Sequence, residues 1–123
     1  MGIIYEKKQK INGYECIYNY KLQPTAALNY FQQASQEQSD QLGVGPEALG
    51  KMGITWFLVK YQIKFHEYPR FNDEVIVETE AMSFDKFAAH RRFAVKGLDG
   101  RMMVEGDTEW MLQNLNENRL ERI

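Results

Sequence analysis

Residues 24–42 form the only long segment of this sequence with a helical rather than a strand-like pattern. Small and apolar side chains recur there at three- and four-residue spacing, which places them on one narrow stripe of a helix: Ala27, Leu28, Tyr30, Phe31, Ala34 and Ser35. At roughly 1.5 Å per residue the segment makes a rod of about 28 Å. Since the chain beyond Gly53 reads as long strands, one helix must pack on one sheet. We expect Leu28 and Phe31 to be buried against that sheet, each contributing roughly 1.5–3 kcal/mol to stability.

The opposite face of this helix carries amides where surface helices usually carry charges: Gln32, Gln33, Gln36, Gln38 and Gln41. Amide groups are stable away from water only when they are hydrogen-bonded. Two interpretations therefore stay open. The amide face is either solvated, or part of it lines a polar cavity or an interface.

The rest of the chain alternates apolar and polar residues in the manner of β-strands. Strands are predicted at residues 3–22, 54–65, 74–81 and 84–98 and in the segment after Gly100. In the second of these, strict alternation places Phe57, Tyr61 and Phe65 on one face. Asp99-Gly100 is a strong hairpin signal and predicts a type I′ turn, in which both central residues have positive φ. The polar residues 114–123 are expected to form a partly mobile tail.

This order predicts an α+β fold in which a curved antiparallel sheet of about five strands wraps a long central helix. The length of 123 residues suits a single domain, residues 1–123. Such a sheet keeps exposed edge strands, which favours pairing with another copy or another domain, so we expect a homodimer or a higher homo-oligomer.

Composition excludes several classes of protein. A formal net charge of −2 gives no support for binding nucleic acid or an anionic membrane. No apolar run approaches the roughly 20 residues that span a bilayer, and no signal peptide opens the sequence. Cys16 is the single cysteine, so no disulfide framework is expected and a reducing cytoplasm fits. His66, His90 and the scattered acids form no metal signature, and we expect no cofactor.

Four segments carry a resemblance to a known family: LNYFQQASQEQSDQLGV, GITWFLVKYQIKF, YPRFNDEVIVET and GDTEWMLQNLNENRLERI. Together with the element order, they resemble the hotdog fold and, more narrowly, the amino-terminal hotdog domain of plant and bacterial acyl-acyl-carrier-protein thioesterases. The resemblance covers nearly the whole chain from about Tyr14. It implies hydrolysis of fatty acyl thioesters of acyl carrier protein (ACP) or CoA, with the acyl chain held between helix and sheet.

The same resemblance leaves a second function open. Members of that family usually carry two tandem hotdog domains, and the catalytic asparagine, histidine and acidic residue belong to the second. Here Leu22 and Pro24 stand near the places of the asparagine and histidine, so those two roles are not carried over. The chain is thus either a thioesterase acting as a hotdog dimer or a non-catalytic acyl-binding domain. A dehydratase-type hotdog would need a histidine near the helix start, which is absent.

Thioester hydrolysis needs a base, a water and donors for the oxyanion. Spacing of seven residues places Tyr30 and Glu37 on one helix face. Two interpretations of Glu37 stay open: it is the candidate base, or it is a carboxylate on the protein surface. Asn29 and Gln33 are the predicted polar positioning residues. Backbone N–H groups at the helix start are predicted to face the substrate near Thr25 and Ala26. Six apolar residues are candidates for the floor of an acyl tunnel or belong to the ordinary core: Trp56, Phe57, Met82, Met102, Met103 and Trp110. Five cations are candidates for contact with a carrier or phosphopantetheine, or are simply solvated: Lys51, Lys60, Arg70, Arg91 and Arg92.

Overall fold

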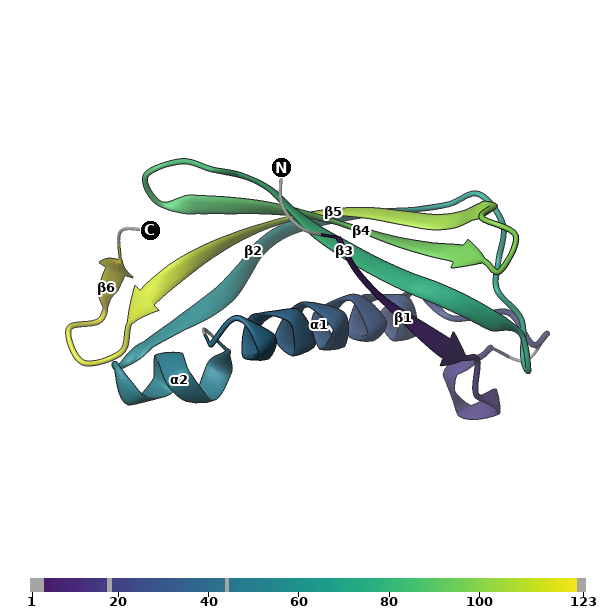
Figure 1. The fold of residues 1–123 in the computed structure, drawn as a ribbon, viewed down its shortest axis with the longest axis horizontal. Helices are drawn as coiled ribbons and strands as arrows, with labels where there is room; N and C mark the ends of the chain where they lie inside the picture. Colours follow the sequence, from purple (N-terminus) through teal and green to yellow (C-terminus); the bar gives the residue numbers. More distant parts are fainter. Residues whose placement is uncertain (1–3, 18, 44, 122–123) are drawn as a thin grey trace.

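A computed structural model describes residues 4–17, 19–43 and 45–121 of the chain. It places one long helix beneath a curved antiparallel sheet (Figure 1). The helical elements are the 3₁₀ turn η1 (Gly13–Glu15), α1 (Pro24–Gln41) and α2 (Pro46–Lys51). The strands are β1 (Tyr5–Lys10), β2 (Ile54–Phe65), β3 (Glu74–Phe84), β4 (Ala88–Gly97), β5 (Met102–Asn114) and β6 (Arg119–Glu121).

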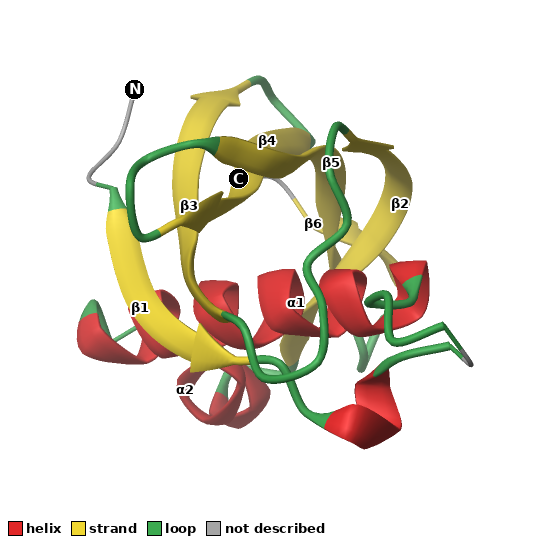
Figure 2. Cartoon of the chain, turned by 90° about the vertical axis from the view of Figure 1, so that its right-hand side faces the viewer, coloured by secondary structure: helices red, strands yellow, loops and turns green. Residues whose placement is uncertain are grey.

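The strands lie in the order β1-β3-β4-β5-β2, every neighbouring pair is antiparallel, and β6 pairs with the end of β5. Viewed from the end of the molecule, the sheet arches over α1 (Figure 2). β1 and β2 are consequently the two edge strands. The arrangement confirms the predicted architecture of one helix wrapped by one antiparallel sheet.

The helix begins at the predicted residue because Pro24 has a fixed φ and needs no hydrogen-bond acceptor at the first helical position. Gln23 precedes it without a side-chain cap. Ala27, Phe31 and Ala34 are fully buried, and the Phe31 ring stacks on Phe93 of β4 with centroids 4.8 Å apart. Leu28 was expected in the same stripe but is only half-buried. Within the described residues no helix is long and apolar enough to cross a membrane.

A bulge in β2 overturns the predicted alternation along that strand. Leu58 pairs with Trp110, whereas Tyr61, three residues later, pairs with Thr108. Trp110 and Thr108 share one face of β5, so Leu58 and Tyr61 also share a face. An extra residue in one strand reverses the phase of everything beyond it. Phe57 and Tyr61, predicted to lie together, therefore lie on opposite faces of the sheet.

The β4–β5 hairpin lies where Asp99-Gly100 predicted it, but its turn type differs. Gly100 has a φ of +88°, whereas Asp99 is not in the left-handed region. The Gly100 N–H donates to the carbonyl of Gly97 at 2.9 Å. This is a three-residue loop with glycine at the left-handed position, not a type I′ turn.

The two ends of the chain also differ from expectation. Residues 14–21 alternate like a strand, yet the described part of this segment contains the η1 turn and isolated bridges such as Cys16 to Leu22. In the polar C-terminal segment, Arg119–Glu121 forms β6 instead of a mobile tail. At the C-terminal end the pairing is with the adjacent end of β5, from Asn114 paired with Arg119 to Leu112 paired with Glu121.

Glu37 joins the edge strand β1 to the C-terminal half of α1. Its Oε2 accepts a hydrogen bond from Lys7 Nζ at 3.0 Å, and its Oε1 accepts one from the Tyr5 hydroxyl at 2.9 Å. Gln33, one turn earlier, donates more weakly at 3.4 Å. Partial burial alone would raise the pKa of Glu37, but the bonds from Lys7 and Tyr5 outweigh it and hold the pKa below its ordinary value. Glu37 is thus a link between helix and sheet.

Truncation of Phe31 tests whether the stacked rings hold helix and sheet together. Phe31→Ala should lower the free energy of unfolding by about 3–5 kcal/mol, because it leaves a cavity beneath Phe93. Leu98→Ala, at an exposed hairpin position, should change it by less than about 0.5 kcal/mol. Urea unfolding followed by circular dichroism measures both, and equal losses would contradict the assignment of the core.

Removal of the Glu37 charge should change how stability depends on pH. A carboxyl whose pKa is lowered by folding stabilises the fold above its unfolded pKa, and this contribution is lost as pH falls through the folded pKa. Between about pH 6 and about pH 3 the wild type should therefore lose more stability than Glu37→Gln. Chemical unfolding across this range measures the difference, with Glu47→Gln at an exposed position of α2 as the matched control. Parallel profiles for wild type and Glu37→Gln would refute the link.

Candidate functional site

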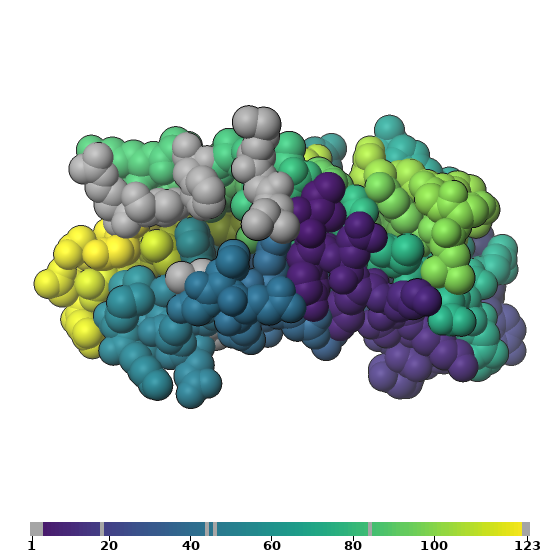
Figure 3. All heavy atoms as spheres, in the orientation of Figure 1, coloured from purple at the N-terminus to yellow at the C-terminus, as the bar shows by residue number. Residues whose placement is uncertain are grey.

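A cavity of about 490 Å³ lies between the C-terminal half of α1 and the sheet. Its walls come from α1, α2 and strands β2 to β5: Gln32, Ser35, Gln36, Ser39, Leu42, Leu49, Thr55, Trp56, Leu58, Ala81, Ala89, His90, Arg91 and Trp110. The C-terminal half of α1, α2 and the C-terminal strand β6 lie at the same end of the molecule (Figure 3). Six elements, two helices and four strands, thus contribute to the walls of one cavity.

One side of this cavity is apolar and aromatic. Trp56 and Leu58 reach it from β2, and Trp110 reaches it from the neighbouring β5. The indole N–H of Trp110 donates to the Thr108 hydroxyl at 2.7 Å, so the ring carries no unsatisfied donor. Both tryptophans of the sequence line the cavity. Trp56, a candidate for the acyl tunnel from the sequence, is one of the residues that line this cavity.

The helix side of the cavity is polar. Gln32 and Gln36 line it together with two serines, Ser35 and Ser39. Gln38 is buried, with 6% of its surface exposed, and its Oε1 accepts a hydrogen bond from Arg91 Nη1 at 2.6 Å. The positions of Gln32 and Gln36 therefore support the interpretation that part of the amide face lines a cavity.

Arg91 connects the sheet to this polar wall. Its Nη1 also donates to the Thr79 hydroxyl of β3 at 3.1 Å. Burial lowers the pKa of Arg91, because the charged form loses hydration. The sequence pattern grouped Arg91 with surface cations, whereas the structure turns it inward.

Most of the predicted site residues lie away from the cavity. Phe57 lies on the face of β2 opposite Trp56, Asn29 and Gln33 are exposed on α1, and none of the three lines the cavity. Thr25 is exposed and Ala26 is buried at the start of α1, which is the end of the helix far from the cavity. Of the residues named from the sequence as candidates for the acyl tunnel, Trp56 and Trp110 line the cavity, and so does Arg91, which was a candidate for contact with the carrier.

The geometry of Glu37 does not favour its predicted role as a general base. Glu37 is not among the cavity residues, and Lys7 and Tyr5 occupy its two oxygens. A base works best with a pKa near the working pH and a free lone pair. The lowered pKa of Glu37 opposes that requirement. Its contacts instead fit the link between β1 and α1.

The start of α1 offers few free donors for an oxyanion. Pro24 has no N–H, and the N–H groups of Ala26 and Ala27 donate to the Gln23 carbonyl at 3.0 and 3.2 Å. The Gln23 N–H itself donates to the carbonyl of Glu15 at 3.0 Å. Two donors already bonded to a carbonyl cannot both serve a developing charge without rearrangement.

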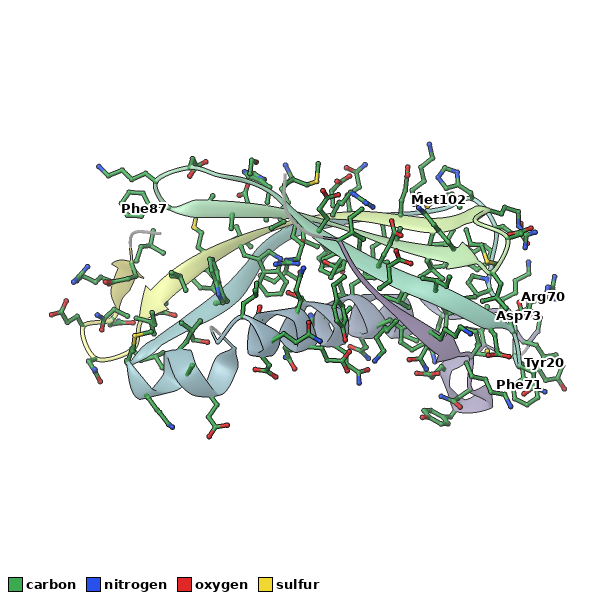
Figure 4. The ribbon with its side chains drawn as sticks, viewed as in Figure 1. Tyr20, Arg70, Phe71, Asp73, Phe87 and Met102 are labelled. Atoms are coloured by element: carbon green, nitrogen blue, oxygen red, sulfur yellow. The ribbon has the colours of Figure 1, made fainter. Side chains whose placement is uncertain are left out.

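Other candidate chemistry is equally sparse in the described part of the chain. No group of three or more His, Cys, Asp or Glu residues is placed to hold a metal ion. His90 lines the cavity, but its Nδ1 lies 3.7 Å from Glu109 in an ion-pair arrangement. Arg70, a predicted carrier contact, lies with Tyr20 and Phe71 at the end of the molecule opposite Phe87 of the β3–β4 hairpin (Figure 4). The polar cavity is therefore the best-defined candidate site.

The fold matches several solved thioesterases. A candidate oleoyl thioesterase from Lactobacillus plantarum superimposes with a TM-score of 0.96 at 24% identity, over 99% of this chain and 48% of that protein. An acyl-ACP thioesterase from Bacteroides thetaiotaomicron gives 0.90 at 21% identity, over 95% and 48%. A DHNA-CoA thioesterase from Staphylococcus aureus gives 0.88 at 13% identity, over 97% and 80%. The chain thus spans about half the length of the first two proteins.

No curated relative matches the chain at a significant level. The family described as the acyl-ACP thioesterase N-terminal domain matches residues 2–123. This match covers nearly the whole chain and agrees with the resemblance seen in its sequence segments and with the superpositions. The chain belongs to the family of acyl-ACP thioesterase N-terminal domains and has the hotdog fold.

Proposed function

We propose that this chain takes part in the hydrolysis of fatty acyl thioesters of ACP or CoA, and that its own cavity holds the acyl chain. The observation that carries the proposal is the cavity of about 490 Å³ between α1 and the sheet, with Trp56, Leu58 and Trp110 in its apolar wall. Membership of the thioesterase family supports the same reaction. Burial of an acyl chain there would gain roughly 0.8 kcal/mol for each methylene removed from water.

The catalytic groups are proposed to lie outside this cavity. Its lining residues include no aspartate or glutamate, and Glu37 is engaged by Lys7 and Tyr5. These features support an arrangement of two hotdog units, in which one unit holds the acyl chain and the other completes the catalytic site. The second candidate function, non-catalytic acyl binding, is favoured by the same lack of a carboxylate in the cavity lining and by the bonded donors at the start of α1.

The edge strand β2 is the proposed surface for that second hotdog unit. It is twelve residues long and ends the sheet, so one row of its backbone groups is available to another strand. Val59 and Tyr61 are apolar residues of this strand with 45% and 55% of their surfaces exposed. A second copy of the chain would form a homodimer there, and a tandem domain would occupy the same edge in a longer protein.

The substrate partner and the compartment are part of the same proposal. Fatty acyl-ACP and acyl-CoA are the two thioester sources, and exposed cations such as Lys51 and Lys60 are available to their acidic carriers. The single, half-buried Cys16 is compatible with a reducing cytoplasm.

A larger side chain in the cavity should weaken acyl binding and leave the rest of the fold unchanged. Ala81→Phe places a larger side chain on the cavity wall. It should weaken binding of acyl-CoA about tenfold or more, because the phenyl ring takes space that the ligand needs and fitting both costs about 1–3 kcal/mol. The fluorescence of Trp56 and Trp110 reports occupancy directly. Leu98→Phe, on the exposed hairpin, is the matched control and should bind like the wild type. Unchanged binding by Ala81→Phe would exclude this cavity as the acyl site.

Hydrolysis of the same acyl-CoA and acyl-ACP series by the purified protein distinguishes the two candidate functions. Turnover that survives in Glu37→Gln supports catalysis by groups other than Glu37, and turnover abolished by that change restores its role as base. Retained acyl binding without turnover selects the non-catalytic function.

Charge on the β2 edge should prevent association. Val59→Asp places a carboxylate at the centre of the proposed interface, and like charges meet when two copies pair there. Sedimentation velocity over a range of concentrations should show dimers for the wild type and monomers for Val59→Asp. Leu98→Asp provides a control on another exposed apolar residue, and its dimerisation should be unaffected. A wild type that stays monomeric would contradict homodimerisation.

A further inference from the structure

The two adjacent arginines of β4, Arg91 and Arg92, have partners of different charge. Arg92 donates to Glu80 at 2.9 Å and to Glu78 at 3.1 Å, and Lys96 also contacts Glu78 at 3.1 Å. Arg91, on the other face of the strand, donates only to the neutral oxygens of Gln38 and Thr79 among the described residues. Of these two arginines, Arg91 lines the cavity, and it has no carboxylate partner among the described residues.

Arg91 lines the cavity and has donors that no residue of the described chain uses. A guanidinium carries five N–H groups, and the bonds to Gln38 and Thr79 both come from Nη1. The described residues contain no buried side-chain nitrogen or oxygen without a hydrogen-bond partner. Since Nε and Nη2 have no acceptor in that part of the chain, these groups are open to the cavity instead of being sealed in the core. They form the planar pair of donors that fits a carboxylate in two-point fashion.

The position of Arg91 in the sheet indicates which end of a ligand would meet it. β2 is one of the two edge strands, β5 follows, and β4 is the central strand of the five in this order. A thioester that enters beside Trp56 and Leu58 of β2 therefore passes the aromatic wall first. The far end of its acyl chain would reach Arg91.

We propose that the cavity selects acyl thioesters whose acyl chain ends in a carboxylate, held by the Nε and Nη2 groups of Arg91, with the methylenes against Trp56 and Trp110. The substrate class is then the half-thioester of a dicarboxylic acid. This inference rests on the proposed function, because it assigns the occupant of the same cavity. Gln38 and Thr79 are positioning residues that hold the guanidinium through Nη1.

Matched pairs of ligands test this selectivity on the purified protein. The probes are hexanoyl-, octanoyl- and decanoyl-CoA, and the CoA half-thioesters of the dicarboxylic acids of equal length. Titration by calorimetry and by tryptophan fluorescence gives the dissociation constants. The carboxylate-ended probe should bind about tenfold more tightly than its methyl-ended partner at one or more lengths, the usual effect of a hydrogen bond to a charged group. CoA alone is the control for binding through its phosphates.

Three variants identify the group responsible. Arg91→Met should abolish the preference for the carboxylate and strengthen binding of the methyl-ended probe. Gln38→Glu keeps the arginine but supplies an internal carboxylate, so it should also abolish the preference, and it guards against misfolding of Arg91→Met. Arg101→Met repeats the first substitution at an exposed hairpin arginine and should leave the preference intact.

The outcomes separate this inference from the proposed function. Tight binding of methyl-ended probes with no gain from the carboxylate overturns the selectivity and leaves acyl binding in place. A preference that persists in both Arg91→Met and Gln38→Glu also overturns it, as does CoA alone binding as tightly as the carboxylate-ended probes. Failure of every probe to alter tryptophan fluorescence overturns the acyl site itself.

Discussion

The close approach of α1 to the sheet at one point determines both the core and the cavity. Phe31 stacks on Phe93 and also covers Gly106 of β5, where a Cβ would lie 3.0 Å from the Phe31 ring. A glycine at this position lets a large aromatic side chain fill the space under the arch. One turn further along the helix, Ala34 and Ser35 are too small to fill the same space. Beyond Phe31 the sheet-facing side chains of the helix therefore change from large to small, and the cavity opens where they shorten.

The polar wall of this cavity follows from the same geometry. Once the space beyond Ala34 is not filled by apolar atoms, the helix can present amides and hydroxyls there, provided that the buried ones are bonded. Gln38 meets this condition through Arg91, and Arg91 is steadied in turn by Thr79. The cavity thus combines an aromatic wall from β2 and β5 with a hydrogen-bonding wall from α1 and β4. A pocket of this composition orients a ligand as well as burying it.

The spacing of apolar residues predicted the helix, the sequence order of helix and strands, and the position of the hairpin, because these depend on residues that are neighbours in sequence. It failed where one residue changes the phase: the bulge beyond Leu58 places Phe57 and Tyr61 on opposite faces of the sheet. Helical spacing correctly placed Glu37 on the face of Tyr30, yet nothing local shows that Lys7 of another element lies against it. The contact between Gln38 and Arg91 joins residues 53 positions apart. The amide-rich face was the one local signal for that site, and it could not identify its partner.

The Gln38–Arg91 pair is not something that the fold requires. Removal of one partner would strand a buried polar group, but replacement of both by apolar side chains of similar volume is often neutral or stabilising in proteins. The neighbouring stretch of the same helix shows that an apolar solution is available, since Ala27, Phe31 and Ala34 pack without polar partners. A cavity meant only for a saturated hydrocarbon would gain from such a replacement, because desolvating a guanidinium is costly and methylenes offer it no compensation. The cation is therefore better explained by what enters the cavity than by what holds its walls together.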